Sequence, residues 1–219
     1  MHMSARSVAP CLAGAALAAC GTVTTYQSAE TLPCGSWHLS AAVSGGQYKD
    51  EPQQTRTPSL TAELSGRVGL TDDTEVTLKL YTLGAQAGLR HRIFDGADGG
   101  RRPGWSLAVL AAVGGVRTSG QGSLPEMILA QASAGALATR RTSAHLSWTL
   151  GALATGSLFV PAGGGHATGW LAGAMLGADW RFAARWHLVP ELSLHRTVAG
   201  EVPVDGSVGQ LGLSIGRDF

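Results

Sequence analysis

The sequence predicts an all-β chain that forms an antiparallel up-and-down transmembrane β-barrel of about ten strands. Three observations predict this fold. Apolar and polar side chains alternate along segments of about 9 to 15 residues, turn residues separate the segments, and the polar faces are rich in Gly and Ser. Only 14% of the residues are charged and 31 are Gly, so part of the surface is expected to face something other than water.

The alternation is clearest in two neighbouring segments. LTAELSGRVGL, residues 60–70, places Leu, Ala and Val on one face and Thr61, Glu63 and Arg67 on the other. EVTLKLY, residues 75–81, repeats this pattern after the tight turn TDD. A period of two is the spacing of a β-strand. The segment length agrees, because a tilted membrane strand needs about 9 to 11 residues.

The same pattern recurs to the end of the chain. The expected strands cover residues 36–45, 59–70, 74–82, 84–94, 104–118, 125–139, 143–157, 168–182, 185–195 and 206–219. An even number of strands is typical of bacterial single-chain barrels. Eight is the main alternative, since residues 74–94 could form one long strand and the first segment could belong to a tether.

The apolar and polar faces predict a lipid-facing outside and a crowded inside. Aromatic side chains near the ends of the apolar face are expected to form girdles at both membrane interfaces. They are Trp37, Trp105, Trp170, Trp180, Trp186 and Phe219. Small residues on the polar face leave room inside a narrow barrel for a few charged groups.

Those charged groups form the predicted lumen cluster. It comprises Glu63, Arg67, Glu75, Lys79, Arg90, Arg92, Asp179, Arg181 and Glu191. Charges enclosed in a small barrel must be paired or hydrated. The cluster therefore indicates either a polar filling that closes the barrel, which we favour because side chains fill small barrels, or a narrow charged pore.

The start of the chain carries an export signal. Residues 8–20, VAPCLAGAALAAC, are apolar but too short to span a bilayer as a helix. LAAC, ending at Cys20, resembles the bacterial lipobox, and this resemblance implies that Cys20 carries a lipid after cleavage. An ordinary signal peptide is the alternative. The expected organisation is a signal peptide over 1–19, a polar tether over 20–35 and a barrel over 36–219.

The remaining cysteine and the net charge limit other chemistry. Cys34 is alone in the mature chain, so no intrachain disulfide is available, and the spacing of the three Cys matches no zinc pattern. We expect no metal and no cofactor. A net charge of +1 gives no strongly basic field, so a nucleic-acid partner is not expected.

The repeated amphipathic segments and the terminal LSIGRDF resemble the bacterial outer-membrane β-barrel family. The motif-like part is Phe219 with the alternating Leu213 and Ile215. The resemblance implies a place in the outer membrane of a Gram-negative bacterium, contact with the lipid bilayer, and recognition of Phe219 by the barrel-insertion machinery.

These observations predict a non-enzymatic barrel with a structural, surface or weak-permeation role. The second hypothesis is a lipid-anchored soluble β-barrel that binds an apolar ligand in the periplasm. The third is a lipid-modifying enzyme that works at the membrane rim. Two histidines and two serines could act in such an enzyme: His145, Ser147, Ser193 and His195. The sequence gives no reason to pair them, and we expect no catalytic residues. The oligomeric state is not predicted.

Overall fold

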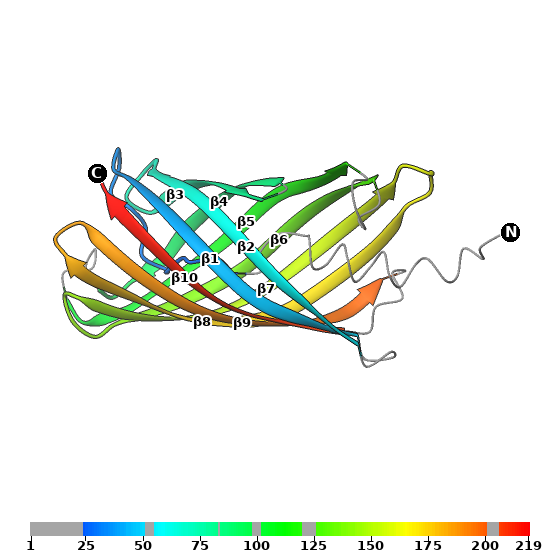
Figure 1. Cartoon of the computed structure of the whole chain (residues 1–219). Helices are drawn as coiled ribbons and strands as arrows, with labels where there is room; N and C mark the ends of the chain where they lie inside the picture. Colours follow the sequence, from blue (N-terminus) through cyan, green and yellow to red (C-terminus); the bar gives the residue numbers. More distant parts are fainter. Residues whose placement is uncertain (1–23, 51–54, 83, 98–101, 120–125, 201–205) are drawn as a thin grey trace, which may run out of the picture.

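The chain folds into a closed barrel of ten antiparallel strands (Figure 1). This computed structural model describes residues 24–50, 55–82, 84–97, 102–119, 126–200 and 206–219. Each strand pairs with its neighbours in sequence, and β1 pairs with β10 to close the sheet. Among the described residues, no helix is long and apolar enough to cross a membrane. The predicted all-β, up-and-down, ten-stranded architecture is confirmed, and the eight-strand alternative is wrong.

The strand bounds follow the alternating segments closely. The strands are β1 (Trp37–Asp50), β2 (Thr55–Gly69), β3 (Thr74–Tyr81), β4 (Gly84–Asp95), β5 (Gly104–Ser119), β6 (Glu126–Arg141), β7 (Leu146–Pro161), β8 (Ala167–Ala183), β9 (Trp186–Gly200) and β10 (Gly206–Asp218). Several of them extend into stretches that the sequence alone suggests are loops, such as QYKD before residue 51. These polar residues stay extended because they pair with residues of the neighbouring strands.

The closing seam joins the two ends of the barrel sequence. β1 and β10 pair from His38 opposite Asp218 to Asp50 opposite Gly206. Beyond the last pair, the Phe219 N–H donates to the Trp37 carbonyl at 2.9 Å, and the two rings stack with centroids 4.4 Å apart. The first and last residues of the barrel therefore lie together at one rim, on the left of Figure 1.

The two rims of the barrel differ. The rim that holds Trp37 and Phe219 also carries the connections 70–73, 96–103, 142–145 and 184–185, and we call it the short-turn rim. The connection over 96–103 is the longest of these four, and the remaining connections lie at the opposite rim. At that opposite rim the β3–β4 hairpin ends before the neighbouring strands do. Tyr81, the last residue of β3, pairs with Glu63, which lies in the middle of β2. Among the described residues, the part of β2 before Glu63 pairs with β1 alone.

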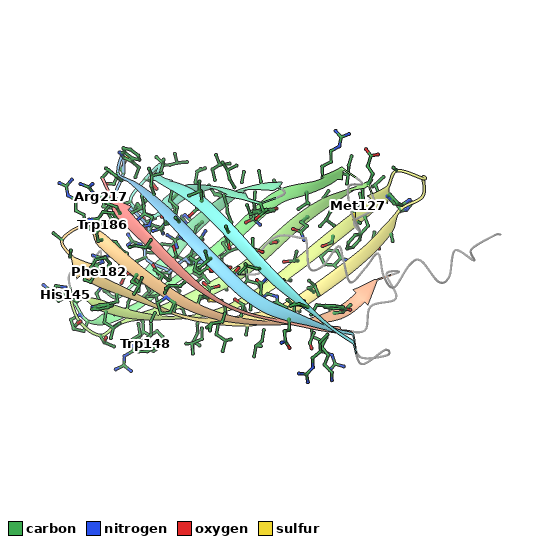
Figure 2. The ribbon with its side chains drawn as sticks, in the orientation of Figure 1. Met127, His145, Trp148, Phe182, Trp186 and Arg217 are labelled. Carbon is green, nitrogen blue, oxygen red and sulfur yellow. The ribbon has the colours of Figure 1, made fainter. Side chains whose placement is uncertain are left out.

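Side chains alternate between a polar inside and an apolar outside (Figure 2). Large apolar side chains on every strand are exposed on the outer face, including Leu64, Leu78 and Leu213. The exposed outer charges that the structure describes lie near the strand ends; they are Arg56, Arg117, Glu126, Arg140, Arg196 and Arg217. A bulge at Ile93 places both Ile93 and Phe94 on the outer face, where strict alternation would turn one of them inward.

Candidate functional site: a lumen occupied by the N-terminal segment

The inside of the barrel is occupied by the chain's own N-terminal segment. Residues 24–32, which we call the lumen segment, contact inward-facing groups of β2, β3, β4, β6 and β9. From Thr24 the segment runs toward the short-turn rim. There the Gly35 N–H donates to the Gly69 carbonyl at 2.9 Å before β1 begins. Figure 1 shows this segment in blue inside the left half of the barrel.

Glu191 holds the start of the lumen segment. Its carboxylate accepts the N–H of Thr25 at 2.6 Å on one oxygen and the N–H of Tyr26 at 2.6 Å on the other. The Ser193 hydroxyl adds a third bond at 3.0 Å. Tyr26 has a φ of 50°, which is unusual for a residue other than Gly. Two successive N–H groups directed at one carboxylate make an anion-binding nest that supports this conformation.

Lys79 links the segment to the opposite wall. Its ammonium group lies 3.0 Å from the Glu63 carboxylate and donates to the Thr24 carbonyl at 2.8 Å. The Thr24 hydroxyl donates to Glu63 at 3.2 Å, and the ammonium also lies 5.8 Å from the centre of the Tyr26 ring. Lys79 and Glu63 are both 4% exposed, so the pair depends on these neutral partners as well as on its own attraction.

Arg90 and Glu75 form the most deeply buried pair. Their side chains are 1% and 0% exposed, and the guanidinium lies 2.7 Å from the carboxylate. Arg67 approaches Glu75 from β2 at 3.6 Å. Arg90 also donates to the carbonyls of Ser28 and Glu30, while the Leu32 N–H donates to Glu75 at 3.1 Å. The pair therefore satisfies backbone groups of the lumen segment that would otherwise be buried without partners.

A second arginine anchors Glu30. Arg141 donates to both oxygens of the Glu30 carboxylate, with the Nε bond at 2.8 Å. The Arg181 guanidinium lies 3.8 Å from the same carboxylate. One residue earlier, the N–H of the fully buried Ala29 donates to the Thr139 hydroxyl at 2.6 Å. A bidentate arginine–carboxylate pair fixes direction as well as distance, so Glu30 is held in register with β6.

The predicted charge cluster divides between the lumen and the short-turn rim. Glu63, Arg67, Glu75, Lys79, Arg90 and Glu191 surround the lumen segment as described above. Arg92 instead pairs at the rim with Asp73 at 2.8 Å and with Asp95 at 3.0 Å. Asp179 lies at the same rim, 2.8 Å from His187. Arg141 and Glu30 were missed, because RRTS suggests a turn and residue 30 lies in the expected tether.

The expected tether is corrected from residue 24 onward. A polar, nearly charge-free stretch predicts a solvated linker when the chain is considered alone. In the structure its polarity matches the barrel interior, where backbone N–H and carbonyl groups of residues 24–32 pair with buried charges of the wall. The expected signal peptide over 1–19 and Cys20 lie outside the described residues. Cys34 is exposed at the rim, and its N–H donates to Asp72 at 3.1 Å.

The space beside the start of the lumen segment is small, whereas a polar hollow of about 530 Å³ lies at the short-turn rim beside Glu30, Arg92 and Asp218. A cavity of about 60 Å³ lies beside Thr24 and Gln27 and is lined mostly by polar side chains, among them Gln131, His195 and Gln210. A cavity of this size holds about four to six water molecules. A drug-sized apolar ligand needs a site of about 300 Å³ or more.

The aromatic residues gather at one rim, which corrects the expectation of two girdles. Trp37, Trp105, Trp180, Trp186 and Phe219 lie at the short-turn ends of their strands, and Trp170 alone lies near the opposite end. Trp148 and Phe182, which Figure 2 labels at the same end of the barrel as Trp186 and Arg217, extend the same belt. Arg217 lies over the rings of Trp186 and Phe219, with its guanidinium carbon 5.6 and 4.9 Å from their centres.

The residues considered for rim catalysis do not share one site. His145 lies exposed in the turn before β7, where its ring contacts the Arg181 carbonyl. Ser147 is buried on the inner face of β7. Ser193 donates to Glu191 deep in the lumen, and His195 lines the small cavity. The four side chains are divided between an exposed turn and the inside of the barrel.

Comparison with known proteins finds likenesses in structure only. No protein-family model and no curated protein matches the chain. The structure of Ail, the attachment invasion locus protein of Yersinia pestis, is 14% identical and covers 85% of this chain and 99% of that chain, with a TM-score of 0.41. Neisserial surface protein A is 11% identical over 84% and 99%, with a TM-score of 0.47. An outer membrane channel from Pseudomonas putida F1 is 14% identical over 90% and 100%, with a TM-score of 0.46. Likenesses at this level say nothing about activity, ligand or partner.

Proposed function

We propose that the protein is a non-enzymatic barrel of the Gram-negative outer membrane whose lumen is closed by its own N-terminal segment. Its role in this proposal is structural, or that of a cell-surface protein, rather than passage of solutes. The short-turn rim faces the periplasm, as is usual for such barrels.

The observation that carries the proposal is the apolar outer face, whose exposed charges among the described residues lie near the strand ends. Large side chains such as Leu64, Val113 and Leu211 are exposed there, at 61%, 63% and 65%. A soluble barrel would present such a continuous apolar band to water at a high free-energy cost. Strands of 12 to 17 residues, β3 apart, are long enough to cross a bilayer at a typical tilt. The aromatic belt and Arg217 then lie at the level of the lipid headgroups.

The closed lumen distinguishes this proposal from a pore. Residues 24–32 cross the half of the lumen next to the short-turn rim. The described residues leave a cavity of about 60 Å³ beside Thr24 and Gln27, and a hollow of about 530 Å³ lies at the rim beside Glu30. The charged wall residues that contact the segment are engaged: Lys79, Arg90 and Arg141 lie in ion pairs, and Glu191 accepts hydrogen bonds from Thr25, Tyr26 and Ser193. This cavity is too small for the apolar ligand of the periplasmic-binding alternative, and the larger hollow at the rim is lined mainly by charged side chains.

Lipidation of Cys20 stays a prediction, and the lumen segment restricts it. Cys20 precedes Thr24 by four residues, so the two Cα atoms lie within about 14 Å of each other. Thr24 is held inside the barrel by Glu63 and Lys79. A lipid on Cys20 would therefore be attached within about 14 Å of a residue that is held inside the barrel. Intact-mass analysis of the mature protein distinguishes a diacylated Cys20 from an ordinary cleaved N-terminus.

Membrane insertion is tested by extraction and gel mobility. We expect the protein to stay in outer membranes washed with high salt, and to migrate differently on gels before and after boiling in detergent. A Cys20→Ala variant should behave in the same way, because the barrel itself is embedded. Release of that variant into the soluble fraction would support a lipid-anchored soluble barrel instead.

Closure is tested in planar bilayers. We expect the purified barrel to give no steady current, and a variant lacking residues 24–32 to conduct. A steady current from the intact protein would contradict the closed lumen. Because the deletion could also impair folding, the conducting species must first show the heat-dependent gel mobility of an intact barrel.

A further inference from the structure

A compact cluster of two histidines and two aspartates lies inside the short-turn rim, on the side away from Arg90. It consists of His38 at the start of β1, Asp179 near the end of β8, His187 at the start of β9, and Asp218 at the end of β10. His38 and Asp218 are opposite each other across the closing seam. The three strands that supply His38, His187 and Asp218 are neighbours in the sheet.

The contacts in this cluster are short and converge on one carboxylate. His38 Nδ1 lies 2.7 Å from one oxygen of Asp218, and His187 Nε2 lies 2.7 Å from the other. One ligand atom from each of these three residues falls within 4.8 Å of the others. The two rings meet edge to face, with centroids 5.4 Å apart. The backbone of Asp218 is fixed as well, since its N–H donates to the Arg185 carbonyl at 2.9 Å.

His187 has a carboxylate at each ring nitrogen. Nδ1 lies 2.8 Å from Asp179, while Nε2 faces Asp218. A neutral imidazole carries one N–H and can donate to only one of these carboxylates, so the other contact would join two acceptors. Either a second proton on the ring or a cation beside Nε2 and Asp218 removes this conflict.

We propose that His38, His187 and Asp218 bind a divalent transition-metal ion, for which zinc is the natural probe. Two imidazole nitrogens and one carboxylate oxygen form a common zinc ligand set, with water as the fourth ligand. Zinc lies about 2.0 to 2.2 Å from such ligands, which places neighbouring ligand atoms about 3.3 Å apart in a tetrahedron. To reach that spacing, the 2.7 Å contacts must open and the ligand atoms that now lie up to 4.8 Å apart must approach, through rotations of the side chains.

The surroundings of the cluster fit this assignment. Asp179 on Nδ1 of His187 reproduces the carboxylate–histidine–metal arrangement that orients metal-bound histidines and strengthens them as ligands. Gly216 has no side chain, and the His38 ring occupies the space next to it. A Cβ at position 216 would overlap Nε2 of this ring. The histidine rings are buried, whereas the Asp218 side chain is 34% exposed, so the ion can enter from the rim.

The bound ion would link the strands that meet at the barrel seam. It would join the first strand to the last two, beside the Trp37–Phe219 stack, at the rim where the barrel closes. This inference depends on the barrel geometry alone and stands whether or not the lumen conducts.

Zinc titration of the full mature protein in detergent, followed by calorimetry, tests the assignment. We expect one zinc per barrel and a thermal transition that rises with added zinc. His38→Ala and His187→Ala should each weaken binding by more than 100-fold. Asp179→Asn should weaken it by about 10- to 100-fold, as expected for a group that orients a ligand. Cobalt in place of zinc should give the absorption bands of a tetrahedral site.

The matched control is His145→Ala, which removes an exposed histidine at the same rim (Figure 2). Zinc affinity of this variant should equal that of the unchanged protein within twofold. Each variant must keep heat-dependent gel mobility, so that lost binding is not lost folding. No binding by the intact barrel, or equal binding by the His187→Ala variant, would overturn the proposal and leave a doubly protonated His187 between two carboxylates.

Discussion

The backbone N–H of Tyr26 donates to the carboxylate of Glu191 at 2.6 Å, although the two residues are 165 positions apart in the sequence. This contact attaches the first described residues of the chain to the ninth strand of the barrel wall. Glu191 is 1% exposed, and its other bonds come from Thr25 and Ser193. The barrel wall and its filling therefore share one set of buried polar groups.

Replacing Glu191 with Gln should loosen the lumen segment. The Gln side chain has one acceptor oxygen, whereas the Glu191 carboxylate accepts the two N–H groups on two oxygens. One of these N–H groups would therefore face the NH₂ donor of the amide. Hydrogen bonds to a charged group contribute about 1.5 to 3 kcal/mol each. We expect the free energy of unfolding to fall by about 2 to 4 kcal/mol in urea titrations of the barrel in detergent.

The control for this change is Glu126→Gln. Glu126 is exposed, and its distance to Arg117 is 3.5 Å, the geometry of a weak surface pair. We expect a change of less than about 0.5 kcal/mol. Equal effects of the two substitutions would mean that Glu191 does not hold the lumen segment.

The sequence could predict the wall of this barrel much better than its contents. Alternation from 60 to 81 already places Glu63, Glu75 and Lys79 on one face, because a strand has a strict period of two. Nothing local indicates that residues 24–32 lie inside. Their backbone groups are satisfied by charges from β3, β4 and β9 and by a hydroxyl from β6. Polar composition alone cannot tell a solvated tether from a segment enclosed by polar walls. For the same reason, the sequence did not predict that Glu30 lies inside the barrel.

Arg90 and Arg92 differ only after folding. Both belong to RHRIF and both enter the predicted lumen cluster, yet Arg90 is enclosed with Glu75 and the lumen segment, whereas Arg92 pairs with the exposed Asp73. We predict that Arg90→Met destabilises the barrel by about 3 to 5 kcal/mol, because it leaves the Glu75 charge buried with its closest partner gone. Arg92→Met should cost less, about 1 to 2 kcal/mol, because the carboxylates of Asp73 and Asp95 that it leaves behind stay partly exposed to water. Thermal unfolding of the two variants side by side measures the difference, and similar losses would contradict the placement of Arg90.

The Trp37–Phe219 stack allows two roles of the terminal aromatic to be separated. If Phe219 is also read by the insertion machinery, Phe219→Ala should sharply reduce assembled barrel in cells, and Phe219→Trp should restore it. In purified protein refolded in detergent the same Ala substitution should cost only about 1 kcal/mol for the lost ring pair, beyond the area it uncovers. Trp148→Ala, at the same rim, is the control for loss of an exposed ring. Normal assembly of Phe219→Ala in cells would remove the signal role.

Gly212 offers the most direct test of the lumen segment. It faces inward from β10, and a Cβ at this position would overlap the hydroxyl of Tyr26, which donates to the Val43 carbonyl at 3.3 Å. We predict that Gly212→Ala displaces Tyr26, so that a cysteine placed at Gln27, with Cys34 replaced by Ser, reacts faster with a water-soluble maleimide. Gly177→Ala is the control, because this inward glycine would place its Cβ no closer than 3.5 Å to any neighbour.

Adding Tyr26→Ala to the Gly212→Ala variant should slow labelling again. The new Cβ at position 212 then has no tyrosine ring to displace, while the backbone N–H bonds to Glu191 remain. The measurement is the maleimide reaction rate in intact, heat-modifiable barrels. Unchanged labelling in Gly212→Ala would mean that the Tyr26 ring does not occupy this space. Fast labelling in all variants, the unchanged protein included, would mean that residues 24–32 are not seated in the lumen.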